Sequence, residues 1–87
     1  MRRKLVAGNW KMNGSADSIR KLLQGIRDGV AEVAAVELAV FPPAVYLGLV
    51  EQQLSGAAVA WGTQNLSDQV SGAYTGEVSA WMVKSTG

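Results

Sequence analysis

The sequence predicts a parallel α/β fold that forms part of a larger barrel, and three observations lead to this prediction. Strand-like and helix-like segments alternate three times along the 87 residues, which favours parallel strands joined by right-handed crossovers. The predicted strands carry apolar residues at consecutive positions, as strands do when both of their faces are buried. Three βα units whose helices all lie on one side cannot cover both faces, so we expect further units to complete the sheet.

The first predicted unit consists of a strand over residues 5–9 and a helix that begins after Ser15. Apolar residues recur along this helix at i, i+3, i+4, i+7 and i+11, namely Ile19, Leu22, Leu23, Ile26 and Val30. This spacing places them on one helix face. We expect Ser15 to cap the helix, Asp17 to stabilise its first turn, and Gly29 to end it.

The second and third predicted units follow the same order. A strand over residues 36–41 ends at Pro42-Pro43, and Pro43 is expected in the first turn of the next helix, where its missing N–H costs nothing. That helix carries Tyr46, Leu47, Val50 and Leu54 on one side and ends at Ser55-Gly56. A third strand is predicted over residues 58–62, followed by a polar loop over residues 63–77 that is long enough to be functional. A third helix is expected from Val78.

The composition excludes several classes of protein. Eight basic and seven acidic residues give a net charge of +1, which offers no electrostatic basis for binding nucleic acid or an anionic membrane surface. The apolar stretches are far shorter than the ~20 residues that span a bilayer. The chain has no cysteine and no histidine, so we expect no disulfide, no metal site and no cofactor. These features are consistent with a cytoplasmic protein.

Two polar residues at the end of the first strand are candidates for ligand binding. Asn9 and Lys11 lie two positions apart, and on a near-extended backbone their side chains would point the same way. A lysine at the carboxyl end of a parallel strand can meet an anionic substrate and the negative charge that develops on it. The alternative is a solvated lysine beside a turn asparagine. Trp10, between them, is predicted to be a packing residue.

The loop after the third strand contains further candidates. Gln64 and Asn65 directly follow that strand, and alone they predict only a turn from strand to loop. Tyr74 lies between glycines and is predicted to be an exposed aromatic residue that meets a partner. Glu77 is the best-placed carboxylate for a general base, although a glutamate at the start of a helix is also stabilised by the helix dipole alone.

Three blocks of this sequence resemble the triosephosphate isomerase family, in the order and at the spacing of that family. The blocks are residues 8–13, residues 41–43 with 46–47, and residues 62–65 with 72–79. The resemblance extends from Lys4 to Gly87 and implies the first three units of a (β/α)8 barrel with helices on the outer face. It implies one domain over residues 1–87, incomplete at its C-terminus, which corresponds to the N-terminal third of the family's chain.

The resemblance also implies an activity. The family interconverts dihydroxyacetone phosphate and glyceraldehyde 3-phosphate through an enediolate, in glycolysis and gluconeogenesis. In this sequence Asn9 would bind the substrate, and Lys11 would both bind it and act in catalysis by stabilising the phosphate and the oxyanion. The family's catalytic histidine, its glutamate base and its phosphate-gripping lid lie later in its sequences. We therefore expect the 87-residue chain alone to be inactive.

The family further implies a homodimer in which the loop over residues 65–78 reaches the neighbouring subunit. Thr75 would touch the other active site, while Gln64, Asn65 and Glu77 would brace the loop. The implied dimer-loop residues are Gln64, Asn65, Tyr74, Thr75, Gly76 and Glu77. An alternative is a non-catalytic fragment that binds phosphate or docks onto copies of itself.

Overall fold

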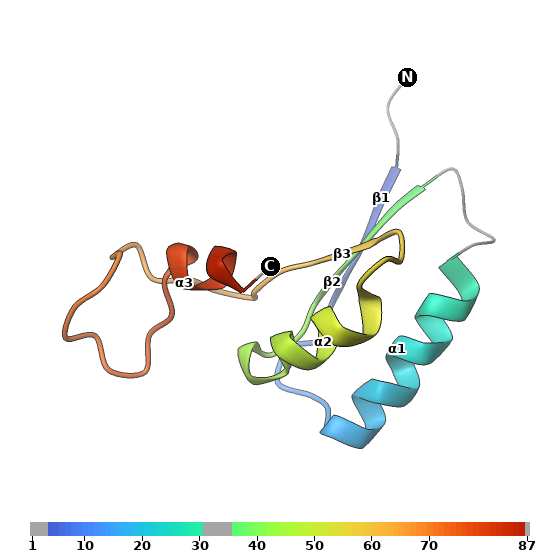
Figure 1. The fold of residues 1–87 in the computed structure, drawn as a ribbon, viewed down its shortest axis with the longest axis horizontal. Helices are drawn as coiled ribbons and strands as arrows, with labels where there is room; N and C mark the ends of the chain where they lie inside the picture. The colour runs from blue at the N-terminus through green and yellow to red at the C-terminus, as the bar shows by residue number, and fades with distance from the viewer. Residues whose placement is uncertain (1–3, 31–35, 87) are drawn as a thin grey trace.

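The computed structural model describes residues 4–30 and 36–86, and within them strands and helices alternate as predicted (Figure 1). In chain order the elements are β1 (Lys4–Asn9), α1 (Ala16–Val30), β2 (Val36–Phe41), the 3₁₀ turn η1 (Ala44–Tyr46), α2 (Leu47–Leu54), β3 (Val59–Trp61) and α3 (Ala80–Ser85). None of the helices in these residues has the length and apolar character needed to cross a membrane.

The three strands form one parallel sheet in the order β1-β2-β3. Asn9 at the end of β1 lies opposite Phe41 at the end of β2, and Val40 lies opposite Trp61 at the end of β3. The three carboxyl ends therefore meet at one edge of the sheet, called the carboxyl edge below. The predicted parallel arrangement is confirmed, and the sheet is open, with β1 and β3 as its two edge strands.

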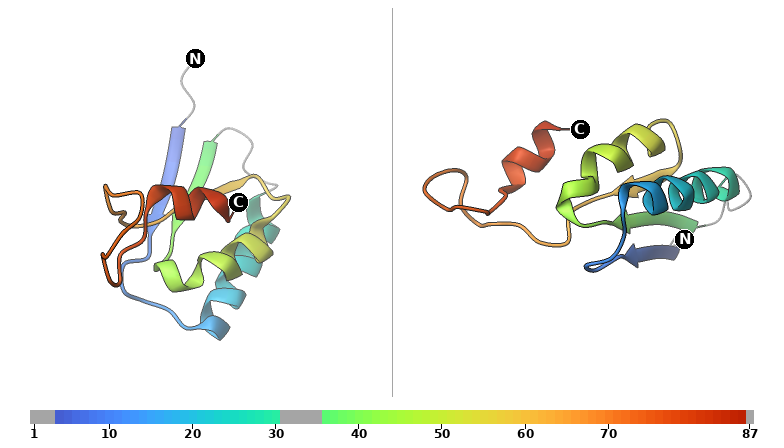
Figure 2. Two further views of the ribbon diagram at one scale, coloured as in Figure 1. Left: turned by 60° about the vertical axis from the view of Figure 1, so that its left-hand side comes forward. Right: turned by 90° about the horizontal axis from the view of Figure 1, so that it is seen from below.

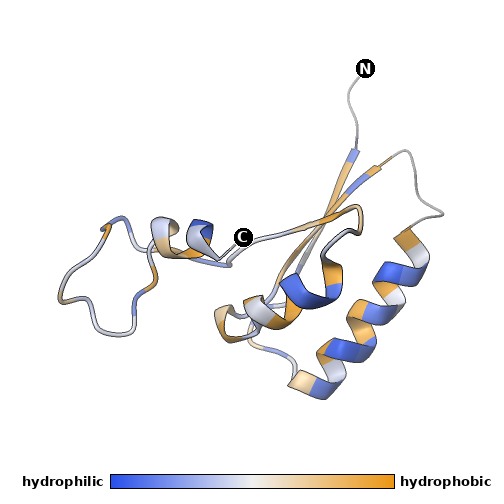
Figure 3. Cartoon of the chain, viewed as in Figure 1, coloured by the Kyte–Doolittle hydropathy of each residue, from blue (hydrophilic) through white to orange (hydrophobic). Residues whose placement is uncertain are grey.

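The hydrophobic core lies between the sheet and the two longer helices. α1 and α2 lie side by side over one face of the sheet (Figure 2). Hydrophilic and hydrophobic residues alternate along α1 (Figure 3), and its polar residues are exposed. The core side chains, each less than a tenth exposed, are Ile19, Leu23, Val40, Val50, Leu54 and Val59. Leu23, Val50 and Leu54 are 0% exposed, which confirms most of the predicted apolar faces. Leu22, predicted on the same face of α1, is the exception and is 48% exposed.

An arginine links the two covering helices. The guanidinium of Arg27, in the last turn of α1, donates from Nη1 to the carbonyl oxygens of Gln53 at 2.9 Å and Ser55 at 3.0 Å. Carbonyl groups at a helix C-terminus have no partner within the helix, and a cation stabilises that end of the dipole. Arg27 thus caps α2 from the neighbouring helix.

The opposite face of the sheet has no helix over it within the described residues. Leu5 is 62% exposed, and side chains alternate between the two faces along a strand. Leu5 therefore projects from the face opposite to Val6, which lies with Leu22 and Ile26 of α1. An uncovered apolar face is the expected result for three βα units of a larger barrel.

The start of α1 is capped as predicted. The Ser18 N–H donates to Ser15 Oγ at 3.2 Å, and the Ser15 N–H donates in return to Ser18 Oγ at 2.9 Å. Such reciprocal bonds satisfy two N–H groups that the first helical turn leaves without partners. The predicted end was wrong, because Gly29 lies inside α1, which continues to Val30.

Three other predicted boundaries also differ from the structure. Pro43 has an extended ψ of 143° and precedes η1, so it does not lie in the first helical turn. Strand β3 is shorter than the predicted 58–62. Helix α3 begins after Ser79 instead of at Val78, because Ser79 is extended and its Oγ accepts the Met82 N–H at 3.2 Å.

The segment between β3 and α3 leaves the sheet and projects beyond its carboxyl edge, together with α3 (Figures 1 and 2). Two contacts close the base of this projecting loop. The Ser67 N–H donates to the Val78 carbonyl at 2.8 Å, and Ser67 pairs with Ser79 in an isolated parallel bridge. The long loop predicted after the third strand is therefore confirmed.

Candidate functional site

The carboxyl edge brings together the polar residues that follow β1 and β3. Backbone bonds continue the sheet slightly past its strands, since the Trp10 N–H donates to the Phe41 carbonyl at 3.2 Å and the Gly62 N–H to the Val40 carbonyl at 3.1 Å. Asn9, Lys11 and Gln64 consequently lie at the same edge. Ligands bind at this end of the strands in parallel α/β proteins.

A side-chain-stabilised turn follows β1. The Lys11 N–H donates to Asn9 Oδ1 at 2.9 Å, and Asn13 Nδ2 donates to the Trp10 carbonyl at 3.0 Å. An asparagine oxygen that binds the N–H two residues later replaces a backbone turn. Asn9 therefore shapes the turn, and within the described residues its Nδ2 group donates to no protein atom.

Lys11 has an unusual backbone conformation. Its φ of 55° makes it the one non-glycine residue with a positive φ within residues 4–30 and 36–86. The prediction that Asn9 and Lys11 project from a near-extended backbone was wrong, because Lys11 has a positive φ and its N–H is bonded to the Asn9 side chain in a turn. A non-glycine residue in the left-handed region costs free energy of order 1–3 kcal/mol, and such strain clusters at functional sites. Lys11 is exposed, and no described carboxylate forms an ion pair with it.

Gln64 joins the ends of β1 and β2. Its Nε2 donates to the Lys11 carbonyl at 2.9 Å and to the Phe41 carbonyl at 2.8 Å. A glutamine amide has two N–H donors, and both are used here. The Phe41 carbonyl accepts from both Gln64 and the Trp10 N–H, so one peptide group ties the three strand ends together.

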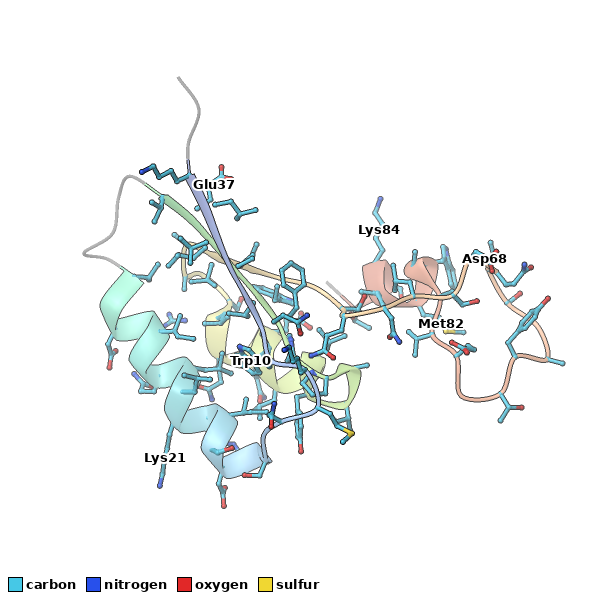
Figure 4. All side chains as sticks on the ribbon, turned by 180° about the vertical axis from the view of Figure 1, so that it is seen from behind. Trp10, Lys21, Glu37, Asp68, Met82 and Lys84 are labelled. Atoms are coloured by element: carbon cyan, nitrogen blue, oxygen red, sulfur yellow. The ribbon has the colours of Figure 1, made fainter. Side chains whose placement is uncertain are left out.

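Trp10 is a packing residue, as predicted. It is partly buried against the core cluster and lines one cavity with Ile19 and Leu22 of α1. Figure 4 shows Trp10 just past the end of β1. The Tyr46 hydroxyl donates to the Gly14 carbonyl at 3.2 Å and holds the segment between β1 and α1 against the start of α2. The turn that carries Lys11 is thus supported from the core side.

The candidates in the distal part of the projecting loop, Tyr74, Thr75, Gly76 and Glu77, lie away from the end of β1 that carries Lys11 (Figure 1). The Glu77 N–H donates to the Tyr74 carbonyl at 3.0 Å, which closes a turn with Thr75 and Gly76 at its tip. Gly76 has a φ of 84°, a conformation that favours glycine at this turn position. Asp68 and Met82, from the same projection, lie far from Trp10 in Figure 4. Glu77 also precedes α3 by three residues, so it is not at the start of a helix.

The sequence placed Asn9 and Lys11 at a strand end, where the structure has them, but it did not indicate the contact from Gln64 to Lys11; their role as site residues stays a prediction. The contact between Gln64 and Lys11 spans 53 residues of sequence, and no local pattern indicates it. Asn65 is exposed, like Gln64 and Thr75. Within the described residues, no group of three acidic, histidine or cysteine side chains could hold a metal ion.

Parallel βα units that present polar side chains at the carboxyl ends of their strands define the class of protein as parallel α/β, and the open sheet is consistent with the first units of a (β/α)8 barrel. A sequence model of triosephosphate isomerase matches residues 4–87. The chain belongs to the triosephosphate isomerase family.

Individual relatives agree with this assignment. The chain is 54% identical to triosephosphate isomerase of Dechloromonas aromatica (strain RCB) over 83 residues, which are 95% of this chain and 33% of the relative. It is 49% identical over 83 residues to triosephosphate isomerase of Coxiella burnetii (strain Dugway 5J108-111), covering 95% of this chain and 32% of the relative. For triosephosphate isomerase of Photorhabdus laumondii, the identity is 44% over 100% of this chain and 34% of the relative. The chain thus spans about a third of the length of these curated relatives.

Proposed function

We propose that the chain is the N-terminal part of a triosephosphate isomerase that interconverts dihydroxyacetone phosphate and glyceraldehyde 3-phosphate in cytoplasmic glycolysis and gluconeogenesis. The observation that supports this proposal is Lys11, an exposed lysine in a strained turn at the carboxyl edge, with its peptide groups bonded to Asn9 and Gln64. No metal or cofactor is required for such a proton transfer.

The proposed chemistry follows from charge. The substrate carries a phosphate anion, and proton removal next to its carbonyl places further negative charge on an enediolate oxygen. A lysine ammonium that is already in place stabilises this charge without reorganisation during the reaction. The Nδ2 group of Asn9 is left to donate to the same substrate, because Asn9 Oδ1 is bound to the Lys11 N–H.

Proton transfer itself needs a base and an acid that this site does not bring together. The sequence has no histidine, and Glu77 lies on the projecting loop. General acid and base groups contribute roughly 10²–10⁴-fold each. We therefore expect the 87-residue chain alone to bind phosphate esters weakly and to show no turnover.

Intact mass and a coupled isomerase assay on the same purified sample test this expectation. A mass near 9.2 kDa without activity is expected, and turnover by such a sample would contradict it. The positive test is a chimera in which residues 1–87 replace the matching third of the Dechloromonas aromatica enzyme. This chimera should be active, and Lys11→Met should lower kcat roughly 10²–10³-fold, whereas Lys21→Met, on the exposed face of α1 (Figure 4), should not.

A second candidate function is self-association through the projecting loop and α3. This segment exposes apolar side chains that are 43–67% accessible, namely Leu66, Val70, Tyr74, Trp81 and Met82. Apolar patches of this kind mark interaction sites, and a homodimer of the complete protein would cover them. Sedimentation velocity of the chimera should give a dimer, and Trp81→Ser should weaken it. A monomer at micromolar concentration would exclude this role.

A further inference from the structure

We propose that Gln64 is a positioning residue for Lys11, holding its backbone in the left-handed conformation so that the ammonium group stays in one place. This inference rests on the function proposed above. It assigns to Gln64 a role inside its own subunit, in addition to bracing the dimer loop.

Lys11 is anchored on both sides of its Cα atom. Its N–H donates to Asn9 Oδ1 at 2.9 Å, and its carbonyl accepts from Gln64 Nε2 at 2.9 Å. The first bond fixes the peptide group before the residue, and the second fixes the peptide group after it. Together the two bonds restrict φ and ψ of a residue whose relaxed state would have a negative φ.

The anchor on the carbonyl side is itself fixed to the sheet. Gln64 Nε2 also donates to the Phe41 carbonyl at 2.8 Å, and Phe41 is paired with Asn9 in the parallel ladder. Gln64 therefore fixes the position of Lys11 relative to the ends of β1 and β2. Asn9 alone cannot do this, because its bond to Lys11 stays within one turn.

Loss of the Gln64 donors should release the strain at Lys11. If φ returns to the negative region, the Cα–Cβ bond points in another direction, and the side chain carries the ammonium group with it. Misplacement of a catalytic group by about 1 Å can cost 10²-fold in rate. Gln64→Met keeps the length and the apolar stem of the side chain and removes only its hydrogen-bonding end.

The test is a double-mutant cycle in the chimera, measured as kcat/KM together with the melting temperature. Gln64→Met should lower kcat/KM roughly 10–100-fold, and Gln52→Met, an exposed glutamine of α2, should leave it unchanged. In the Lys11→Met background, Gln64→Met should cause no further loss above about twofold, because Gln64 acts through Lys11. Gln64→Asn keeps the amide on a shorter stem that cannot reach both carbonyls, and it should reproduce the cycle if Gln64→Met fails to fold.

The outcomes separate the two proposals. If Lys11→Met leaves kcat/KM unchanged, the proposed function fails. If Lys11→Met is damaging but Gln64→Met and Gln64→Asn are harmless, or cause the same loss with and without Lys11, the positioning role of Gln64 fails on its own. Binding of inorganic phosphate to the 87-residue chain can also be monitored by NMR through the amide signal of Lys11. Gln64→Met should bind phosphate with a severalfold higher Kd than the unsubstituted chain.

Discussion

The left-handed conformation of Lys11 predicts an inverted effect of glycine and alanine at this position. Lys11→Ala and Lys11→Gly both remove the ammonium group, so the difference in their stability reports on the backbone alone. With a φ of 55° at this residue, we expect the Lys11→Gly protein to be the more stable of the two. At an ordinary helical position the order is the opposite.

The expected magnitude combines two effects. An L-residue in the left-handed region costs roughly 1–2 kcal/mol, which glycine avoids. Glycine in turn gains more conformational entropy in the unfolded chain, which offsets about 0.4–1 kcal/mol. The free energy of unfolding of Lys11→Gly should therefore exceed that of Lys11→Ala by about 0.8 kcal/mol, the midpoint of a range of about 0–1.6 kcal/mol.

Urea denaturation measures this difference. Fluorescence reports on Trp10 and Trp61, which contact the core, and far-UV circular dichroism follows the same transition. Lys21 provides the matched control, because it is an exposed residue inside α1. There, the glycine variant should be less stable than the alanine variant by about 1 kcal/mol. A Lys11→Ala protein that is more stable than Lys11→Gly, the same order as at Lys21, would refute the strained conformation.

Three further substitutions test the packing and the caps. Gly14→Ala should destabilise by about 1–3 kcal/mol, chiefly because φ is 114°, and a Cβ there would also lie 2.8 Å from Ile19 Cδ1, at the end of a side chain that must shift. A loss below about 0.5 kcal/mol in the free energy of unfolding, measured with urea, would contradict this backbone strain. Arg27→Met should lower the free energy of unfolding by about 1 kcal/mol, because the bonds to the carbonyl groups at the end of α2 are lost. Arg20→Met is the control: it breaks the exposed ion pair with Asp17, whose two side chains are 54% and 91% accessible, and should change the free energy of unfolding by less than about 0.5 kcal/mol. Ser15→Ala should cost about 1 kcal/mol and accelerate amide exchange in the first turn of α1, and unchanged exchange would argue against the cap.

The sequence predicted most where the determining contacts are local or periodic. The apolar spacing of α1 identified Ile19 and Leu23, which are 2% and 0% exposed, and Ser15 identified the N-terminus of the helix. The alternation of strands with helices predicted the parallel sheet, because a helix that connects two strands leaves few other topologies. Asn9 and Lys11 became candidates because they lie at the end of a predicted strand, and their role in binding stays a prediction.

The features that the sequence did not predict depend mostly on contacts between residues that are distant in the chain. Gln64, 53 residues further along the sequence, donates to the Lys11 carbonyl and stabilises the conformation of Lys11. Neither a lysine nor a glutamine at these positions indicates that the two residues are in contact. The expected extended backbone at Lys11 failed because Asn9 uses its side chain to form the turn. Helix α3 began later than its apolar pattern suggested, since the cap at Ser79 decides the boundary more strongly than Val78 does.

The closed base of the projecting loop makes the sequence of the loop independent of the sequence that the sheet and core require. Because Ser67 and Ser79 are paired and the Ser67 N–H is bonded to the Val78 carbonyl at 2.8 Å, strain within residues 68–77 does not pass to β3 or to the core. The entropy of closing a loop grows slowly, by about 0.6 kcal/mol for each doubling of its length. Insertions and deletions between Asp68 and Glu77 should therefore be tolerated by the fold, even where they change what the projecting loop contacts.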